Sequence, residues 1–144
     1  MKIVAQRVIK SKVEVSNKVV GEIEHGLMLL VSFTHTDTEE NIDYMVKKVL
    51  GLRIFDDESG VMNRSVLDVG GSILSISQFT LYADTKKGNR PSYINALSGD
   101  KATVLYDKFN EKLRQFIKVE TGIFGSEMKV SLINDGPVTI ILEK

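Results

Sequence analysis

Neutral polar side chains gather in one short stretch of the sequence, Ser77-Gln78-Phe79-Thr80. Apolar residues occupy even positions before this stretch and odd positions after it, so the two-residue period of a strand changes phase there. Such a change predicts a β-bulge, which leaves backbone N–H groups unpaired. Unpaired N–H groups beside hydroxyl and amide side chains are the components of an oxyanion hole. The alternative interpretation is an ordinary irregularity of an edge strand.

The side chains that usually act as catalysts are scarce. The sequence has no cysteine, which excludes thiolate catalysis, disulfides and zinc sites built on cysteine. Its 2 histidines, His25 and His35, stand in segments typical of a turn and of a helix cap, so we expect structural roles for both. No phosphate-binding or dinucleotide-binding motif occurs. The sequence therefore predicts no metal and no cofactor.

A second unusual stretch, Asn134-Asp135-Gly136-Pro137, contains one of only 2 prolines in the chain. These four residue types favour turns, and the Val-Thr that follows begins a strand. The local pattern therefore predicts a hairpin corner between two closing strands. A Gly-Pro bond is either cis or trans, and local sequence does not distinguish the two.

Length and charge limit the function classes. The 144 residues, 42% of them hydrophobic, predict one folded domain spanning residues 1–144. Basic and acidic residues balance at 19 each, so an RNA contact requires a local patch. Lys86, Lys87 and Arg90 are the best candidates for such a patch, and a solvated loop is the alternative. The apolar run at 27–33 is too short to cross a membrane, and the N-terminus is too polar for a signal peptide, so we expect a cytoplasmic protein.

The elements that would position these residues follow from apolar periodicity. Alternation over residues 12–16 predicts a half-buried strand, and the apolar run at 26–33 predicts a central strand covered on both faces. A helical period follows, with a cap at Asp37 or Thr38 and an end at Gly51. Its expected buried face is Ile42, Met45, Val46, Val49 and Leu50.

The second half of the chain predicts a loop or loose hairpin at 56–66, two strands joined at Gly70-Gly71, and a second helix within 99–118. The expected apolar stripe of that helix is Val104, Leu105, Phe109, Leu113, Phe116 and Ile117. Two strands around the Gly-Pro stretch close the chain. Roughly eight strands and two helices in this order predict the α+β class.

Together, the two polar stretches resemble the motifs of the D-aminoacyl-tRNA deacylase family. The sequence has SQFTL at 77–81 and NDGPVT at 134–139, where the family carries SQFTL and N-x-G-P-[VF]-T. The resemblance extends over the whole chain, including LRIF at 52–55 and MNRSVLDVGG at 62–71. Asn89 and Tyr93 depart from the Arg and Phe of many members, a change that affects loop contacts to the substrate.

The resemblance implies a fold, an activity and an assembly. The implied fold is a barrel-like pair of mixed, mostly antiparallel sheets with two main helices. The implied reaction is hydrolysis of the ester that joins a D-amino acid, or mischarged glycine, to the terminal adenosine of tRNA, with rejection of L-aminoacyl-tRNA. The implied assembly is a homodimer with active sites at the subunit interface. No cofactor, metal or membrane is implied.

The resemblance also implies roles in catalysis for the first stretch. The backbone N–H of Phe79 would lie near the oxyanion, with Ser77, Gln78 and Thr80 lining the pocket. Thr80 as a covalent nucleophile is the rival interpretation, weakened by the lack of a general base beside it.

Four further residues have roles implied by the resemblance. Gly136 and Pro137, joined by a cis bond, would reach into the partner's pocket and exclude L side chains. Arg7 would help hold the partner's Gly-Pro loop. Met128 would contact the adenosine or the pocket wall, and filling of core space is its alternative role.

Two other classes of function stay open. A non-catalytic module of the same fold would bind RNA through Lys86, Lys87 and Arg90, consistent with the missing catalytic side chains. A purely structural dimer would use the Gly-Pro turn only for packing. Cleavage of D-tyrosyl-tRNA but not of L-tyrosyl-tRNA would support the deacylase, and a trans Gly136–Pro137 bond would favour the structural dimer.

Overall fold

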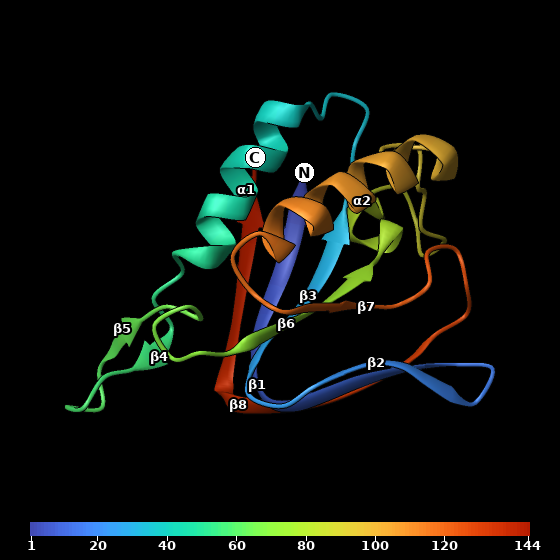
Figure 1. The fold of residues 1–144 in the computed structure, drawn as a ribbon. Coiled ribbons are helices and arrows are strands. Elements are labelled where there is room, and N and C mark those ends of the chain that lie inside the picture. Colours follow the sequence, from blue (N-terminus) through green and yellow to red (C-terminus); the bar gives the residue numbers. More distant parts are fainter.

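A mixed sheet of six strands carries the fold, and two helices pack on one of its faces (Figure 1). The computed structural model describes residues 1–144. The sheet has the order β2-β1-β3-β6-β7, with β8 on the other edge of β1. Its strands are β1 Lys2–Val15, β2 Lys18–Ile23, β3 Gly26–Ser32, β6 Ser72–Ser77, β7 Val119–Thr121 and β8 Lys129–Glu143. The other elements are α1 Glu39–Leu50, β4 Phe55–Asp56, β5 Met62–Arg64, the 3₁₀ helix η1 Phe79–Tyr82 and α2 Gly99–Arg114.

The sheet curls into a near-barrel because β1 has three neighbours. The first half of β1 pairs with β3, its second half pairs with β2, and β8 follows the opposite edge along most of its length. At Gly21 the backbone of β2 comes so close to β7 that an added Cβ would lie 2.8 Å from the Thr121 carbonyl oxygen. The curled part encloses a small apolar core of Val8, Val13, Ile23, Met28, Leu74 and Ile76. The predicted α+β class and barrel-like sheet are confirmed.

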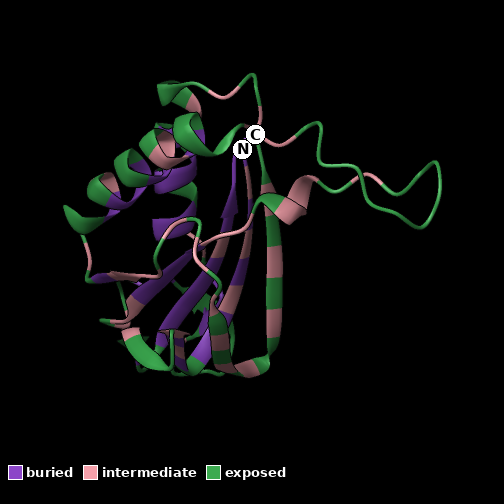
Figure 2. Ribbon diagram, turned by 90° about the vertical axis from the view of Figure 1, so that its right-hand side faces the viewer, coloured by how far each residue is buried: buried purple, intermediate pink, exposed green.

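A larger core of 21 residues lies between the sheet and the helices. Figure 2 shows the buried sheet under the helices, whereas β8 alternates between exposed and intermediate residues on the other side. The five residues predicted for the buried face of α1 are all buried. Thr38 caps α1, and both its backbone N–H and its hydroxyl donate to the side-chain oxygen of Asn41, at 2.9 and 2.8 Å. The prediction for this helix is therefore confirmed.

The predicted stripe of α2 is wrong at two positions, because Val104 and Phe116 are both exposed. The helix ends at Arg114, so Phe116 lies beyond it. The buried face includes Tyr106, whose hydroxyl donates to the Ser75 carbonyl at 2.7 Å. A tyrosine can belong to the buried face of a helix when its hydroxyl has a hydrogen-bond partner. A pattern of apolar residues does not reveal such a tyrosine.

Of the two strands predicted around Gly70-Gly71, the second is confirmed as β6, whereas the first is wrong because residues 66–70 form turns. The phase change at residues 77–78 is not a bulge. The Gln78 N–H makes a last bond to the Val31 carbonyl at 2.8 Å, and the chain then enters η1. A helical turn shifts the apolar pattern just as a bulge does, so the pattern alone does not separate them.

The predicted hairpin corner at residues 134–139 is wrong, because the chain does not reverse there and β8 stays antiparallel to β1 on both sides of the stretch. Asn134 pairs with Val8 and Thr139 pairs with Gln6, so residues 135–138 stand opposite Arg7 alone. The two halves of β8 therefore share one partner strand, and the Gly-Pro segment forms an outward loop within it. No helix in the structure is long and apolar enough to cross a membrane.

Candidate active site

A pocket of about 310 Å³ opens at the carboxyl ends of β3 and β6. These two strands run parallel, with Val31 beside Ser77. Ligands of sheets with parallel strands commonly bind beyond the carboxyl ends of those strands, where the chain leaves the sheet. The lining residues are Val31, Ser32, Phe33, Ile76, Ser77, Gln78, Phe79, Leu97, Ala102, Phe124, Gly125, Ser126, Met128 and Val130.

Three of the four residues predicted for catalysis meet at this pocket. Ser77 ends β6, and Gln78 and Phe79 lead into η1. The first N–H groups of a helix have no partner within it, so the start of η1 leaves the N–H of Phe79 without an intrahelical acceptor. The Phe79 ring is 56% exposed and packs edge-on against Tyr93, with ring centroids 5.0 Å apart.

Thr80 differs from its prediction, because it is not among the residues that line the pocket. Its hydroxyl oxygen accepts a hydrogen bond from the side-chain amide of Gln78. The Gln78 amide is neutral and is the donor in this hydrogen bond, so it does not accept the hydroxyl proton of Thr80. The contact therefore orients Thr80 but does not activate it as a nucleophile.

The lining of the pocket contains no ionisable side chain. His25 packs edge-on against Phe55 at 5.1 Å, and a ring nitrogen of His35 lies 2.9 Å from the Ile94 carbonyl oxygen, both away from the pocket. Two tyrosines near the pocket have raised pKa values: Tyr106, whose pKa burial raises and whose ring packs 5.7 Å from that of Phe124, and Tyr82, on η1. Burial, together with the charges of Asp37 and Glu143, raises the pKa of Tyr82 to about 12. The hydroxyl of Tyr82 therefore stays protonated at neutral pH.

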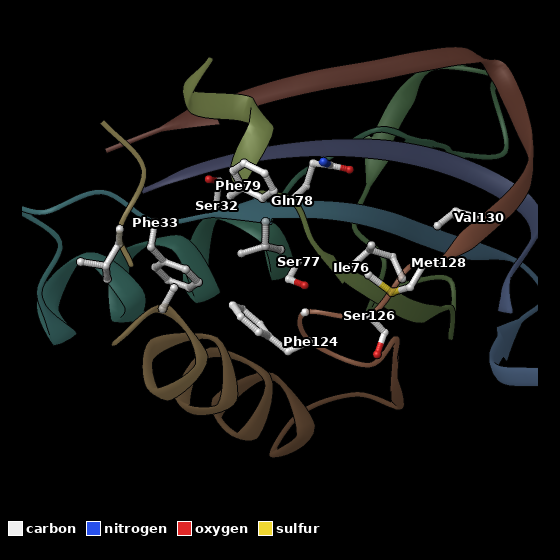
Figure 3. A pocket seen from close by; sticks show the side chains of 14 residues that line it. Ser32, Phe33, Ile76, Ser77, Gln78, Phe79, Phe124, Ser126, Met128 and Val130 are labelled. Carbon is white, nitrogen blue, oxygen red and sulfur yellow. The ribbon is translucent and has the colours of Figure 1, made fainter. Parts of the chain in front are cut away.

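Met128 lies in the pocket wall, as predicted, and also contacts the small apolar core. Figure 3 shows Met128 beside Ile76, with Ser77 and Phe124 around the same opening. Gly122 makes room for it, since a Cβ at that position would lie 2.4 Å from the Met128 sulfur. The two roles weighed for Met128 are thus both present in the structure, although the contact with adenosine stays a prediction.

Several pocket residues were not found from the sequence, notably Ser32, Phe33, Phe124 and Ser126. They come from segments far apart in the chain, so no local pattern groups them. A serine inside the apolar run of β3 was the one available signal. The Ser32 hydroxyl is buried without a hydrogen-bond partner, which is unusual for a polar atom.

The Gly-Pro loop is braced by the side chain of Asn134. Its oxygen accepts the Val138 N–H at 2.7 Å, and its amide donates to the Val138 carbonyl at 3.1 Å. Gly136 has a φ of +141°, and the Gly136–Pro137 bond is cis, as the resemblance implied. Gly136 and Pro137 are exposed, and neither lines the pocket of its own chain.

The buried side chain of Arg7 fixes this loop through a hydrogen bond. It donates from Nε to the Asp135 carbonyl at 2.9 Å and from Nη1 to the Ile54 carbonyl at 2.7 Å. The Asp135 carboxylate lies 3.3 Å from Nε. The loop that Arg7 contacts in the structure belongs to the same chain, and the contact with a partner's loop stays a prediction.

The fold and the pocket together define the class of this protein. It is an α+β protein whose near-barrel sheet ends in a pocket of neutral polar and aromatic groups. The chain belongs to the D-Tyr-tRNA(Tyr) deacylase family, which matches residues 4–143.

Two solved structures resemble this one. The first, described as "c-Myc DNA Unwinding Element Binding Protein", is 40% identical, with a TM-score of 0.95 over 100% of this chain and 99% of that chain. The second, described as a probable eukaryotic D-amino acid tRNA deacylase, is 20% identical, with a TM-score of 0.83 over 98% of this chain and 97% of that chain. The likeness to the second structure shows that the two proteins share a fold.

Proposed function

We propose that this protein hydrolyses the ester of D-aminoacyl-tRNA, and of tRNA mischarged with glycine, and rejects L-aminoacyl-tRNA. The observation that carries the proposal is a family-matched pocket with hydroxyl, amide and backbone donors but no ionisable side chain. An aminoacyl ester is already activated, so positioning and stabilisation of the oxyanion suffice for its hydrolysis. The proposal takes residues 1–144 as one domain that acts in the cytoplasm.

In the proposed reaction, a water molecule attacks the ester carbonyl carbon and forms a new C–O bond. The Phe79 N–H stabilises the negative charge that develops on the carbonyl oxygen. The bond to the ribose oxygen then breaks, and a proton from the water ends on that oxygen. The products are the free D-amino acid and uncharged tRNA. The neighbouring ribose hydroxyl of the substrate is placed to orient the water, which fits a pocket without its own general base.

Chirality is proposed to be read by main-chain atoms of Gly136 and Pro137 from a second subunit. In one chain these residues lie outside the pocket, on an exposed loop, which suits a loop that enters the pocket of a partner. Their carbonyl groups would meet the substrate's α-amino group and leave no space for an L side chain. Such a filter acts by steric rejection, so it accepts many D-amino acids and also glycine.

The test is deacylation of D-tyrosyl-tRNA and L-tyrosyl-tRNA by the same preparation. We expect rapid loss of the D ester and no loss of the L ester beyond the rate in buffer. Glycyl-tRNA is expected to be cleaved as well. Equal cleavage of both enantiomers, or cleavage of neither, would contradict the proposal.

A second candidate function is nucleic-acid binding without hydrolysis. It is favoured by one observation, the 40% identity to a protein described as binding a DNA unwinding element. A DNA duplex that binds while both tyrosyl esters stay intact would support this candidate. Hydrolysis of the D ester with no DNA binding would exclude it.

A further inference from the structure

We propose that the loop between η1 and α2 carries a binding surface for the phosphates of the tRNA acceptor end. This inference rests on the proposed function and extends it to contacts with the phosphate backbone of the tRNA. The surface is the basic tip, defined as residues 85–91. It contains Lys86, Lys87 and Arg90, which are all exposed.

The loop forms a narrow projection rather than part of the body of the protein. Figure 2 shows it as the long exposed segment that leaves the sheet. Its two arms are joined by a pair of backbone bonds between Asp84 and Ser92, at 2.8 and 2.9 Å. Gly88, with a φ of +131°, lies within the turn at the tip. The projection carries the three cations outward from the sheet and the helices.

The charges of the basic tip are unpaired. Every ion pair in the structure lies elsewhere, on the strands, on the helices or at the chain ends. The nearest carboxylate in sequence, Asp84, accepts the backbone N–H of Lys86 at 2.9 Å and so shapes the turn. The chain has no net charge, so an attraction for a polyanion must come from a local group such as this one.

Both arms of the loop are anchored at the pocket. One arm leaves η1, whose first residue, Phe79, lines the pocket. The other arm returns to Leu97, which also lines the pocket and donates its N–H to the Phe33 carbonyl at 2.9 Å. Tyr93 packs against Phe79 between these anchors. A substrate bound in the pocket would therefore lie beside the loop that carries the basic tip.

The length of the arms limits which part of a tRNA the tip can meet. Arg90 lies seven residue steps after Ala83, and an extended chain spans at most about 3.6 Å per residue, so the tip lies within roughly 25 Å of η1. Phosphates along a stacked strand follow one another about every 3.4 Å. The cations therefore reach the last several nucleotides before the 3′ end, and not the distant arms of the tRNA.

The test compares the variant Lys86→Gln/Lys87→Gln/Arg90→Gln with the matched control Lys18→Gln/Lys47→Gln/Lys48→Gln. The control removes the same charge from exposed lysines on β2 and α1. Binding of uncharged tRNA is measured by fluorescence anisotropy across a series of salt concentrations. Hydrolysis is measured with D-tyrosyl-tRNA and with D-tyrosyl-adenosine, an ester without phosphates.

We expect the tip variant to bind tRNA at least about tenfold more weakly at low salt, with the slope of log affinity against log salt reduced by about 2–3. Its kcat/KM for D-tyrosyl-tRNA should fall in parallel, while its kcat/KM for D-tyrosyl-adenosine stays at the wild-type value. The control variant should match wild type throughout.

Wild-type affinity and salt slope in the tip variant would overturn the proposal. An equal loss on both esters would also overturn it, because it would indicate damage to the pocket. Tighter binding of a DNA duplex than of tRNA through the same tip would replace tRNA with DNA as the partner. If wild type cleaves neither ester, the proposed function fails, whereas the tRNA-binding series still supports or contradicts the basic tip.

Discussion

At the scale of single residues, the pocket is lined by neutral polar groups, which in the proposed function position the substrate rather than react with it. Thr80, outside the pocket lining, fits this pattern as well, because its hydroxyl accepts from the Gln78 amide and has no base beside it. Ser77 is the last residue of β6, and the Gln78 N–H donates to the Val31 carbonyl of β3. Both residues are therefore held in place by the sheet. Positioned donors of this kind contribute to the rate without forming a covalent intermediate.

We therefore expect Thr80→Ala to keep kcat for D-tyrosyl-tRNA within about tenfold of wild type, since losing a covalent nucleophile costs on the order of 10⁶ in kcat. The measurement is single-turnover deacylation, with circular dichroism to verify folding. Thr36→Ala, a change at an exposed position between β3 and α1, is the control and should be neutral. Complete loss of activity in a folded Thr80→Ala protein would favour the nucleophile.

Tyr82 gives a prediction about alkaline pH. Burial, assisted by nearby acidic groups, raises its pKa to about 12, above the model-peptide value of 10.0. The folded protein therefore holds this proton more tightly than the unfolded chain does, and the resulting stability is complete below pH 10 and lost as pH rises toward 12.

Urea unfolding of wild type and Tyr82→Phe at a series of pH values from 9 upward tests this, because Phe has no proton to lose. We expect the free energy of unfolding to fall less steeply above pH 10 in Tyr82→Phe than in wild type. Parallel pH curves for wild type and Tyr82→Phe would contradict the assignment.

At the scale of elements, the sequence predicts best where the signal is local. The helix at 39–50 was predicted in full because its cap, its charges and its apolar face all lie within a few turns. The continuous course of β8 was missed because turn residues also form loops within a strand. The pocket was predicted at Ser77 to Phe79 and at Met128, whereas Ser32 and Phe124 join it only through tertiary structure.

Gly136 allows a prediction for the Gly-Pro loop as an element. A Cβ there would lie 2.6 Å from the Cγ2 atom and 2.8 Å from the backbone nitrogen of Val138, at a φ of +141°. We expect Gly136→Ala to distort the loop and to lower kcat/KM for D-tyrosyl-tRNA by at least about tenfold, a loss of about 1.4 kcal/mol in transition-state stabilisation. Because the loop is exposed, the thermal midpoint should change little.

The control for this change is Gly99→Ala, where an added Cβ meets no atom within 4 Å and φ is not positive. Both variants are compared by deacylation of the two tyrosyl enantiomers and by thermal unfolding. Wild-type activity and discrimination in Gly136→Ala would show that the loop plays no part in the site.

At the scale of the whole molecule, β8 presents a free edge next to the Gly-Pro loop. The strand pairs only with β1, and it exposes Ile133 by 58% and Ile141 by 67%, one on each side of the loop. Apolar side chains on an unpaired edge strand favour association with another chain. This surface is therefore our expected location for the dimer interface of the proposed function.

Sedimentation equilibrium should give the mass of two chains for wild type and of one chain for Ile133→Lys/Ile141→Lys at micromolar concentration. Deacylation of D-tyrosyl-tRNA should be lost together with the dimer. Val104→Lys, on the helical face and 56% exposed, should leave both mass and activity unchanged. A monomeric wild type with full activity would refute the interfacial site.

The outward loop in β8 also bears on how such a protein can diversify. Residues 135–138 stand opposite a single residue, while the strand on either side keeps its own pairing with β1. Insertions or deletions within these four positions would change how far the loop projects without slipping either flank by a register step. In the proposed function, where this loop reads the substrate, such changes would alter substrate range while the sheet stays as it is.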